Sequence, residues 1–337
     1  MPRLPYVAVP RREAERARRA LARESLLVRG VRVRREGDRV LFPVEDAGEA
    51  ARVLEREGVP FESGEGEFES VCSGPRSVEE VLEERLGVSC SVSYDVVGDV
   101  AVVQVPEELE GREEEVGRAI MEVHGRVRAV FERGPVRGVF RVRELRRIAG
   151  EGPPVTEHRE HGCRFRVDLS RCYFNPRLAT ERRLLAEEVV EEGSRVLDMF
   201  AGVGPITVIL KRFVPDVRVV ACELNPVAYR YLLENLELNR VSARAFLGDA
   251  GEVVRLLGRF DYVIMNAPKF AHRFLRAAAR VVRSGGRLVY YRIAGSVGEA
   301  FEEVRERLGE GVELESWREV KPYSPEESLF RLVVRVP

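Results

Sequence analysis

Residues 195–205, Arg-Val-Leu-Asp-Met-Phe-Ala-Gly-Val-Gly-Pro, pass from an apolar run into a turn with two glycines. The apolar run predicts a buried strand that ends at Asp198, and Pro205 is a residue that often opens a helix. Gly202 and Gly204 have no Cβ, so the backbone there can approach a ligand closely. The stretch predicts a strand, a loop and a helix with a ligand at the carboxyl end of the strand. A plain strand-to-helix turn is the alternative interpretation.

The segments that follow this loop alternate between strand and helix patterns. The predicted strands lie over residues 195–198, 217–223, 260–265 and 287–291, and the predicted helices over 205–213, 225–239 and 270–283. This alternation is typical of a doubly wound parallel sheet, a Rossmann-like α/β fold. Residues 312–336 predict two more strands, which we expect to form an antiparallel hairpin at the sheet edge.

Two acidic residues follow the next strands of this pattern. Glu223 ends the second strand, where a carboxylate can accept hydrogen bonds from ribose hydroxyls. Asp249 comes after Phe246-Leu-Gly248, where a third strand would end before the strand over 260–265, and it could accept a hydrogen bond from an adenine amino group. Gly204 is followed by Pro205-Ile-Thr, so the loop lacks the spacing of the dinucleotide-binding GxGxxG motif. The pattern favours a nucleoside cofactor over a dinucleotide.

The loop also resembles a known motif. Its string Asp-x-Phe-x-Gly-x-Gly-Pro is similar to the first motif of class I methyltransferases, whose cofactor is S-adenosylmethionine. The cofactor-binding residues that the resemblance and the strand ends imply are Asp198, Phe200, Ala201, Gly202, Gly204, Pro205, Glu223, Leu224, Asp249 and Asn266. The five cysteines and four histidines show no metal-ligand spacing, so we expect no metal.

The fourth strand ends in Asn266-Ala-Pro268, which resembles the Asn-Pro-Pro motif of enzymes that methylate a nitrogen of a planar group. The Asn side-chain oxygen and the following backbone carbonyl can hold an N–H edge in line with a methyl sulfonium. A turn-forming Asn before a helix-starting Pro is the alternative.

A longer motif, Tyr173-Phe-Asn-Pro-Arg-Leu-Ala-Thr-Glu-Arg182, precedes the sheet region. Together with the cofactor loop and residues 263–272, it resembles the archaeal and eukaryotic tRNA (guanine-N1)-methyltransferases that act at guanosine 37. The resemblance runs from about Ser77 to the end, and more loosely through the N-terminal residues. It implies S-adenosylmethionine as cofactor and tRNA as substrate.

The chemistry of guanine requires specific groups in such a site. N1 carries a proton near neutral pH, so methylation needs a base for that proton and a donor for the charge that develops on O6. The resemblance implies a catalytic set of Glu181 as base, Arg141 as O6 partner, Asn266, Tyr173 and Pro268. Arg143 lies in the same Arg-x-Arg-Glu-Leu pattern and is an alternative to Arg141. Glu181 could instead merely stabilise the start of a helix.

Other activities remain open at this point. Ala267 stands where many archaeal relatives have Leu or Pro, which leaves open a wyosine precursor as the substrate. An aminocarboxypropyl transferase of wyosine synthesis would use the same cofactor, but its relatives lack the Asn-x-Pro arrangement. A tRNA-binding protein without catalysis is the third hypothesis.

The sequence before the sheet region divides into three parts. Residues 1–40 contain twelve arginines and five carboxylates, which predicts a basic tRNA-binding module over 1–60. Glycine and glutamate between 61 and 76 predict a linker, residues 77–180 a small α+β domain, and 181–337 the catalytic domain. The resemblance implies that the module binds the outer corner of tRNA and the rest binds the anticodon stem-loop. A solvated helix face would also explain the arginines.

Composition limits the remaining possibilities. The chain has 55 Lys and Arg against 56 Asp and Glu, so its net charge does not indicate a polyanionic partner. No apolar run approaches the length of a membrane span, which predicts a cytoplasmic protein without membrane contact. We also expect a monomer and a core position for the single Trp317.

Overall fold

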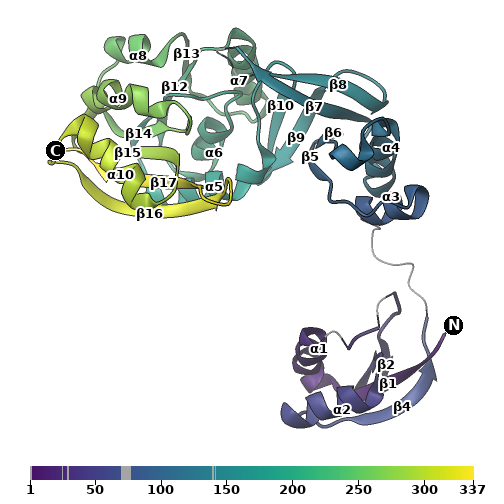
Figure 1. Ribbon diagram of the computed structural model, residues 1–337. Helices are drawn as coiled ribbons and strands as arrows, with labels where there is room; N and C mark the ends of the chain where they lie inside the picture. The colour runs from purple at the N-terminus through teal and green to yellow at the C-terminus, as the bar shows by residue number, and fades with distance from the viewer. Residues whose placement is uncertain (1, 25, 29, 70–76, 139, 141) are drawn as a thin grey trace. The chain divides into compact units, whose positions relative to one another are not determined.

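The structure is a computed structural model that describes residues 2–24, 26–28, 30–69, 77–138, 140 and 142–337. The chain divides into two compact units, Met1–Val81 and Leu82–Pro337 (Figure 1). Within the described residues, no helix combines the length and apolar character that a membrane crossing requires.

The N-terminal unit is an antiparallel sheet with two helices on one face. The strand order is β2-β3-β1-β4, formed by β1 (Arg3–Pro10), β2 (Arg34–Glu36), β3 (Arg39–Pro43) and β4 (Glu62–Glu67). A 3₁₀ turn (Arg11–Glu13) leads into α1 (Ala14–Arg23), and α2 (Ala47–Arg56) follows the sheet hairpin. Both helices bury Ala and Leu side chains against Val and Phe side chains of β1 and β3. The sequence pattern predicts helices over residues 11–23 and 47–56 and a hairpin over 31–42. These elements are present, whereas β1 was not predicted.

The predicted linker over residues 61–76 is wrong in its first half. Glu62–Glu67 form strand β4, which pairs with β1 from Arg3 to Ala8. Gly64 is required here by packing: a Cβ at this position would lie 2.7 Å from the hydroxyl of Tyr6. The glycines thus make room for an aromatic ring, and their number is no sign of a flexible segment. The second half of the expected linker, residues 70–76, lies outside the described residues.

The additional strand also changes the charge of the N-terminal unit. Residues 1–69 contain 14 arginines and 14 carboxylates, so the excess of positive charge in residues 1–40 is balanced within the unit. Glu57, Glu62, Glu65 and Glu69 form ion pairs with arginines of the first 40 residues. Most of these pairs are exposed, so each contributes little to stability. The basic module predicted from residues 1–40 is, as a folded unit, neutral.

The second unit begins with a small α+β region. Its sheet has the order β5-β6-β7-β8, from β5 (Ser93–Val97), β6 (Val100–Gln104), β7 (Ala129–Arg137) and β8 (Val142–Gly150). The helices are α3 (Val78–Leu86) and α4 (Glu113–Val123). The sequence pattern predicts one helix over residues 107–122. This helix is split, because a 3₁₀ turn (Glu107–Leu109) is separated from α4 by Gly111, whose φ is 81°.

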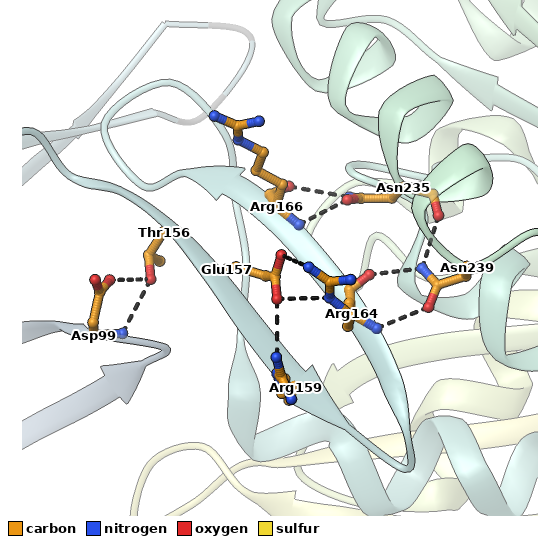
Figure 2. A network of polar contacts seen from close by, with 8 residues as sticks. All are labelled: Asp99, Thr156, Glu157, Arg159, Arg164, Arg166, Asn235 and Asn239. Carbon is orange, nitrogen blue, oxygen red and sulfur yellow. Dashed lines mark hydrogen bonds and ion pairs between the residues drawn. The ribbon is translucent and has the colours of Figure 1, made fainter. Parts of the chain in front are cut away.

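A hairpin of β9 (Val155–Glu160) and β10 (Cys163–Asp168) connects this region to the large sheet (Figure 2). The Asn235 side chain, on α7 (Pro226–Leu238), accepts a hydrogen bond from the backbone N–H of Arg166 at 2.7 Å and donates to its carbonyl at 3.0 Å. Asn239 does the same for Arg164. The Thr156 hydroxyl donates to Asp99 in the β5–β6 turn at 2.6 Å. These bonds join both parts into one compact unit.

The large sheet has seven strands in the order β13-β12-β11-β14-β15-β17-β16. The parallel strands are β11 (Arg195–Asp198), β12 (Arg218–Glu223), β13 (Arg244–Leu247), β14 (Phe260–Met265) and β15 (Val282–Ala294). β16 (Glu313–Pro322) and β17 (Ser328–Arg335) form the antiparallel hairpin predicted at the edge. The Rossmann-like prediction for this region is confirmed.

Helices cover both faces of the large sheet. One face is packed against α5 (Ala179–Leu184), the π-helical segment Leu185–Val189, α6 (Pro205–Phe213) and α7. The other is packed against α8 (Ala250–Val253), α9 (Leu275–Val281) and α10 (Val297–Leu308). Trp317 lies on the edge strand β16 and is 52% exposed, so its predicted core position is wrong. An edge strand has no neighbour to cover its outer side.

A buried ion pair connects α5 to the β9–β10 hairpin. Arg182 donates through Nε to Glu160 Oε1 at 2.7 Å and through Nη2 to Oε2 at 2.5 Å. Both side chains are less than 5% exposed. Such a two-bond pair satisfies both charges, but loss of one partner would leave the other charge buried and unpaired.

We predict that Arg182→Met lowers the free energy of unfolding by about 3–5 kcal/mol, because the Glu160 carboxylate stays buried without its partner. Addition of Glu160→Leu should recover most of this loss. Urea unfolding of the full-length chain would measure both effects. A double variant as unstable as the single one would contradict the explanation.

Candidate functional site

The candidate site lies where the strand order of the large sheet reverses. From β11 the chain adds β12 and β13 on one side and β14 on the other, so the loops after β11 and β14 leave the sheet in opposite directions. Ligands of open α/β sheets bind in the crevice at such a point, outside the carboxyl ends of the strands. The predicted cofactor loop follows β11, and Asn266 directly follows β14.

The cofactor loop has the backbone form that its glycines predict. Gly202 and Gly204 have φ values of 58° and 90°, which a residue with a Cβ rarely adopts. A Cβ at Gly204 would lie 2.4 Å from Leu232 on α7, so this glycine lets the loop pack closely against that helix. The Ala201 N–H donates to the Cys222 carbonyl at 2.9 Å, and Pro205 opens α6. The loop is therefore held on two sides.

Asp198, the last residue of β11, supports the start of this loop. Its carboxylate is fully buried and accepts a hydrogen bond from the Thr207 hydroxyl at 2.9 Å through Oδ2. Burial raises the pKa of Asp198 to about 7. Oδ1 has no hydrogen-bond partner among the described residues. An unpaired buried acceptor beside a glycine loop suits a ligand that carries N–H groups, such as the amino acid part of S-adenosylmethionine.

Glu223 combines loop support with the predicted ribose site. Oε2 accepts from the Gly202 N–H and Oε1 from the Asn225 N–H, each at 2.7 Å. Burial raises the pKa of Glu223, and these two backbone donors oppose the rise. Each carboxylate oxygen has a second lone pair, so both can still accept a ribose hydroxyl. The bonds also fix the carboxylate at the loop that it serves.

Exposed apolar side chains lie beside Glu223. Leu224 is 44% exposed. Leu247, on β13, lies opposite Glu223 of β12 in the sheet register and is 50% exposed. Asp249 caps α8 by accepting from the Gly251 N–H at 2.7 Å and is itself exposed. Apolar surface beside a hydrogen-bond acceptor is the arrangement that an adenine ring requires. Sequence analysis missed Leu247, because a leucine at a strand end gives no signal of its own.

Phe200, the aromatic residue of the cofactor loop, packs against the segment that follows Asn266. Phe200 lies edge-on to the rings of Phe270 and Phe274, with centroids at 5.5 and 5.2 Å. These contacts join the cofactor loop to the segment after Asn266. They indicate that Phe200 shapes the site through packing.

The Asn266-Ala-Pro268 segment forms the turn after β14. The Ala267 carbonyl accepts from the backbone N–H groups of Phe270 and Ala271 at 2.9 and 2.8 Å, so it has no free lone pair for a ligand. The expected use of the following carbonyl as an acceptor is therefore not supported. Asn266 is half-buried, and its side chain makes no hydrogen bond within the described part of the chain. Its amide is the group available to a base edge.

Glu181 is the most buried of the predicted catalytic residues in the described chain. It is 5% exposed, on α5, and it is held from two strands of the large sheet. The Tyr291 hydroxyl on β15 donates to Oε1 at 2.8 Å, and Arg331 Nη1 on β17 donates to the same oxygen at 2.9 Å. Burial raises the pKa of Glu181, while Arg331 and Tyr291 lower it. A glutamate that only stabilised the first turn of a helix would need neither this burial nor partners on two strands.

The other members of the predicted catalytic set differ in what the structure describes. Tyr173 precedes α5 and is 60% exposed, and its carbonyl lies 4.0 Å from the place of a Gly202 Cβ. Pro268 is half-buried in the turn after β14. Arg141 lies outside the described residues, and Arg143 is half-buried on β8. The structure thus brings Tyr173 next to the cofactor loop.

Sequence analysis also missed the residues that hold Glu181. Arg331 lies between Phe330 and Leu332 in the apolar middle of β17, and a charge at such a position indicates a buried partner. Tyr291 gave no comparable signal, because aromatic residues are common in strands.

The chain is similar to known proteins along nearly its whole length. Residues 156–316 match the TRM5/TYW2 methyltransferase domain, 76–153 the TYW2 N-terminal domain, and 7–51 the tRNA methyltransferase 5 N-terminal domain. The chain is 38% identical to tRNA (guanine(37)-N(1))-methyltransferase Trm5b of Pyrococcus abyssi, over 98% of both sequences. The crystal structure of Pyrococcus abyssi Trm5b is similar with a TM-score of 0.73, 37% identity and coverage of 98% and 99%.

A second solved structure is the complex of aTrm5 and tRNALeu, with a TM-score of 0.69, 31% identity and coverage of 98% of this chain and 99% of that one. Sequence identity and fold agree along nearly the whole length. The chain belongs to the TRM5/TYW2 methyltransferase family.

Proposed function

We propose that this chain methylates N1 of guanosine 37 in tRNA, with Glu181 as the base that removes the N1 proton. The relatives that match over the whole chain carry the name of this activity. The observation that supports the role of Glu181 is a buried carboxylate with one oxygen, Oε2, left without a hydrogen bond. A carboxylate with a raised pKa is a better base than an exposed one.

The methyl donor of this family is S-adenosylmethionine, which supplies an electrophilic methyl group on a sulfonium. Glu223 would bind its ribose, and the backbone of Gly202 gives the ligand room. Leu224 and Leu247 would contact the adenine, with Asp249 as acceptor for the amino group. The free Oδ1 of Asp198 remains for an N–H group.

The guanine would be held by the remaining predicted residues. Asn266 would bind the base edge, and Tyr173 would line the pocket. We propose Arg141 as the donor to O6, on the motif match alone. N1 lies within the base stack of an RNA loop, so the base must turn out to reach a buried carboxylate. That the protein is cytoplasmic and that it is a monomer both stay predictions.

Two alternatives use the same site. A wyosine precursor at position 37 would need a wider pocket, and the small side chain of Ala267 leaves that open. An aminocarboxypropyl transferase would move a different carbon chain from the same cofactor, and Asn266-Ala-Pro268 argues against it.

The first experiment offers methyl-labelled S-adenosylmethionine and two unmodified tRNA transcripts that differ only in guanosine or adenosine at position 37. We expect N1-methylguanosine from the guanosine transcript alone, identified by mass spectrometry of the nucleosides. Label in neither transcript would reject the proposed substrate and favour a wyosine precursor or a binding role. A heavier adduct would indicate aminocarboxypropyl transfer.

The role of Glu181 predicts a pH-dependent defect. Glu181→Gln should lower the single-turnover rate by roughly 10²–10⁴ near neutral pH, because no group accepts the N1 proton. The defect should shrink as the pH rises towards the pKa of N1 itself, because hydroxide then removes the proton. A constant defect at all pH values would argue for a structural role. Circular dichroism and cofactor binding control for folding.

The N-terminal unit offers a limited set of cations for tRNA. Among its described residues, four arginines are exposed and form no ion pair: Arg11, Arg12, Arg35 and Arg52. The Arg11 N–H donates to the Asp38 carbonyl at 2.8 Å, so Arg11 and Arg12 lie beside the β2–β3 turn, and Arg35 lies on β2 close to the same turn. We propose that this end of the unit contacts tRNA phosphates at the outer corner.

The double change Arg11→Ala and Arg12→Ala should weaken tRNA binding and reduce the slope of log affinity against log salt by about 2, because two phosphate contacts are lost. Filter binding over a salt series measures both. The matched control is Arg18→Ala with Arg19→Ala, whose guanidinium groups already bind Glu15. Equal effects from both pairs would contradict the assignment.

A further inference from the structure

The Glu181 carboxylate is engaged in an asymmetric way. Oε1 accepts two strong hydrogen bonds, at 2.8 Å from the Tyr291 hydroxyl and at 2.9 Å from Arg331 Nη1. Oε2 accepts none from the residues that the structure describes, and the Arg318 Nε lies 3.7 Å from it. A carboxylate that needed only burial would be expected to have donors on both oxygens. Here one oxygen is anchored and the other is left as an acceptor.

The two anchoring groups come from the rigid part of the fold. Tyr291 on β15 is 1% exposed, and the Arg331 side chain on β17 is 5% exposed. Their strands pair directly, with Tyr291 opposite Arg331 in the antiparallel register. The backbone hydrogen bonds between these two strands therefore fix the positions of both donors. The Glu181 carboxylate, on the short helix α5, is held against them.

We propose that Tyr291 and Arg331 are positioning residues, which anchor Oε1 of Glu181 so that Oε2 faces the substrate and accepts the N1 proton. This inference rests on the proposed function. The position of the anchor supports it: β15 pairs with β14 so that Tyr290 lies beside Met265, and Tyr291 therefore lies level with Asn266. The residue that anchors the carboxylate, Tyr291, thus lies level with the residue whose amide would bind the base edge.

Arg318 lies over Oε2, the free oxygen of Glu181. It lies on the edge strand β16, directly opposite Arg331 in the register, and its side chain is 44% exposed. Because the Arg318 side chain is exposed, it can move away from Oε2 without disturbing the core. The base reaches Oε2 once this side chain moves.

The charges around Glu181 define the sign of the pH effect. Burial raises the pKa of Glu181, and Arg331, Tyr291 and Arg318 lower it. Glu188, on the π-helical segment, lies 3.8 Å from Arg331 Nη2 and shares that cation. Removal of the Tyr291 hydroxyl removes one lowering contribution, so the pKa of Glu181 must rise. Because the base acts only when ionised, the acidic limb of the rate profile must move to higher pH.

The test is Tyr291→Phe, which removes one oxygen and keeps the ring. We expect the midpoint of the acidic limb of the single-turnover rate to rise by roughly one pH unit, and the KM for tRNA to stay unchanged. Carbon-13 NMR of glutamate-labelled protein should show the same rise in the Glu181 carboxyl signal, which is assigned by its absence in Glu181→Gln. Arg331→Gln should shift the midpoint further, and Arg331→Lys should restore part of it.

Two matched variants serve as controls. Tyr290→Phe removes the neighbouring hydroxyl, which donates to Glu303 at 2.6 Å, and Arg182→Met breaks a buried ion pair on the same helix as Glu181. Both should lower stability without moving the midpoint.

The outcomes separate this inference from the proposed function. If the wild-type chain forms N1-methylguanosine and Tyr291→Phe leaves the midpoint unchanged, the positioning role is overturned and the activity stands. A carboxyl signal that shifts without any change in the rate profile would overturn it as well. If Glu181→Gln keeps full activity, the role of the base fails, and the positioning role fails with it.

Discussion

Parallel pairing of β11 with both β12 and β14 forces these strands to end at one edge of the large sheet. A parallel strand cannot continue into a tight hairpin, so the chain must leave each strand through a loop at that edge. Gly202, Glu223 and Asn266 are far apart in the sequence, and this constraint alone brings them to a common edge. The hydrogen bond from Gly202 to Glu223 then joins two of the loops directly.

The buried amide of Asn235 extends this arrangement beyond the sheet. It is 0% exposed, it binds both backbone groups of Arg166, and it donates to the Val203 carbonyl of the cofactor loop at 2.8 Å. One side chain on α7 therefore fixes the β9–β10 hairpin relative to the cofactor loop. The segment that leads from this hairpin to Tyr173 and Glu181 starts from a defined position. Loss of such a buried amide would leave several backbone groups unpaired at once.

The alternating pattern of the sequence was sufficient to predict the order of elements in the large sheet and the place of the cofactor loop, because both depend on local periodicity and on glycine. Strands β1 and β4 of the N-terminal sheet were not predictable in this way. The prolines in β1 are unusual for a strand, so β1 was not predicted. The glycines of β4 are typical of a linker, and only the structure shows that they make room for the Tyr6 ring. In the site, Glu181 and Asn266 follow from motifs, whereas Tyr291 and Arg331 follow from the register of two antiparallel strands. That register is set by contacts that are remote in the sequence.

The balanced charge of the N-terminal unit limits the distance over which it can act on a polyanion. A body with 14 cations and 14 anions has no net attraction at long range. Exposed charges that are further apart than a Debye length are screened from one another, so an arginine attracts a phosphate only when the two lie close together. In the proposed complex with tRNA, the unit would therefore be held by local contacts of single arginines, and the field of the whole unit would contribute little.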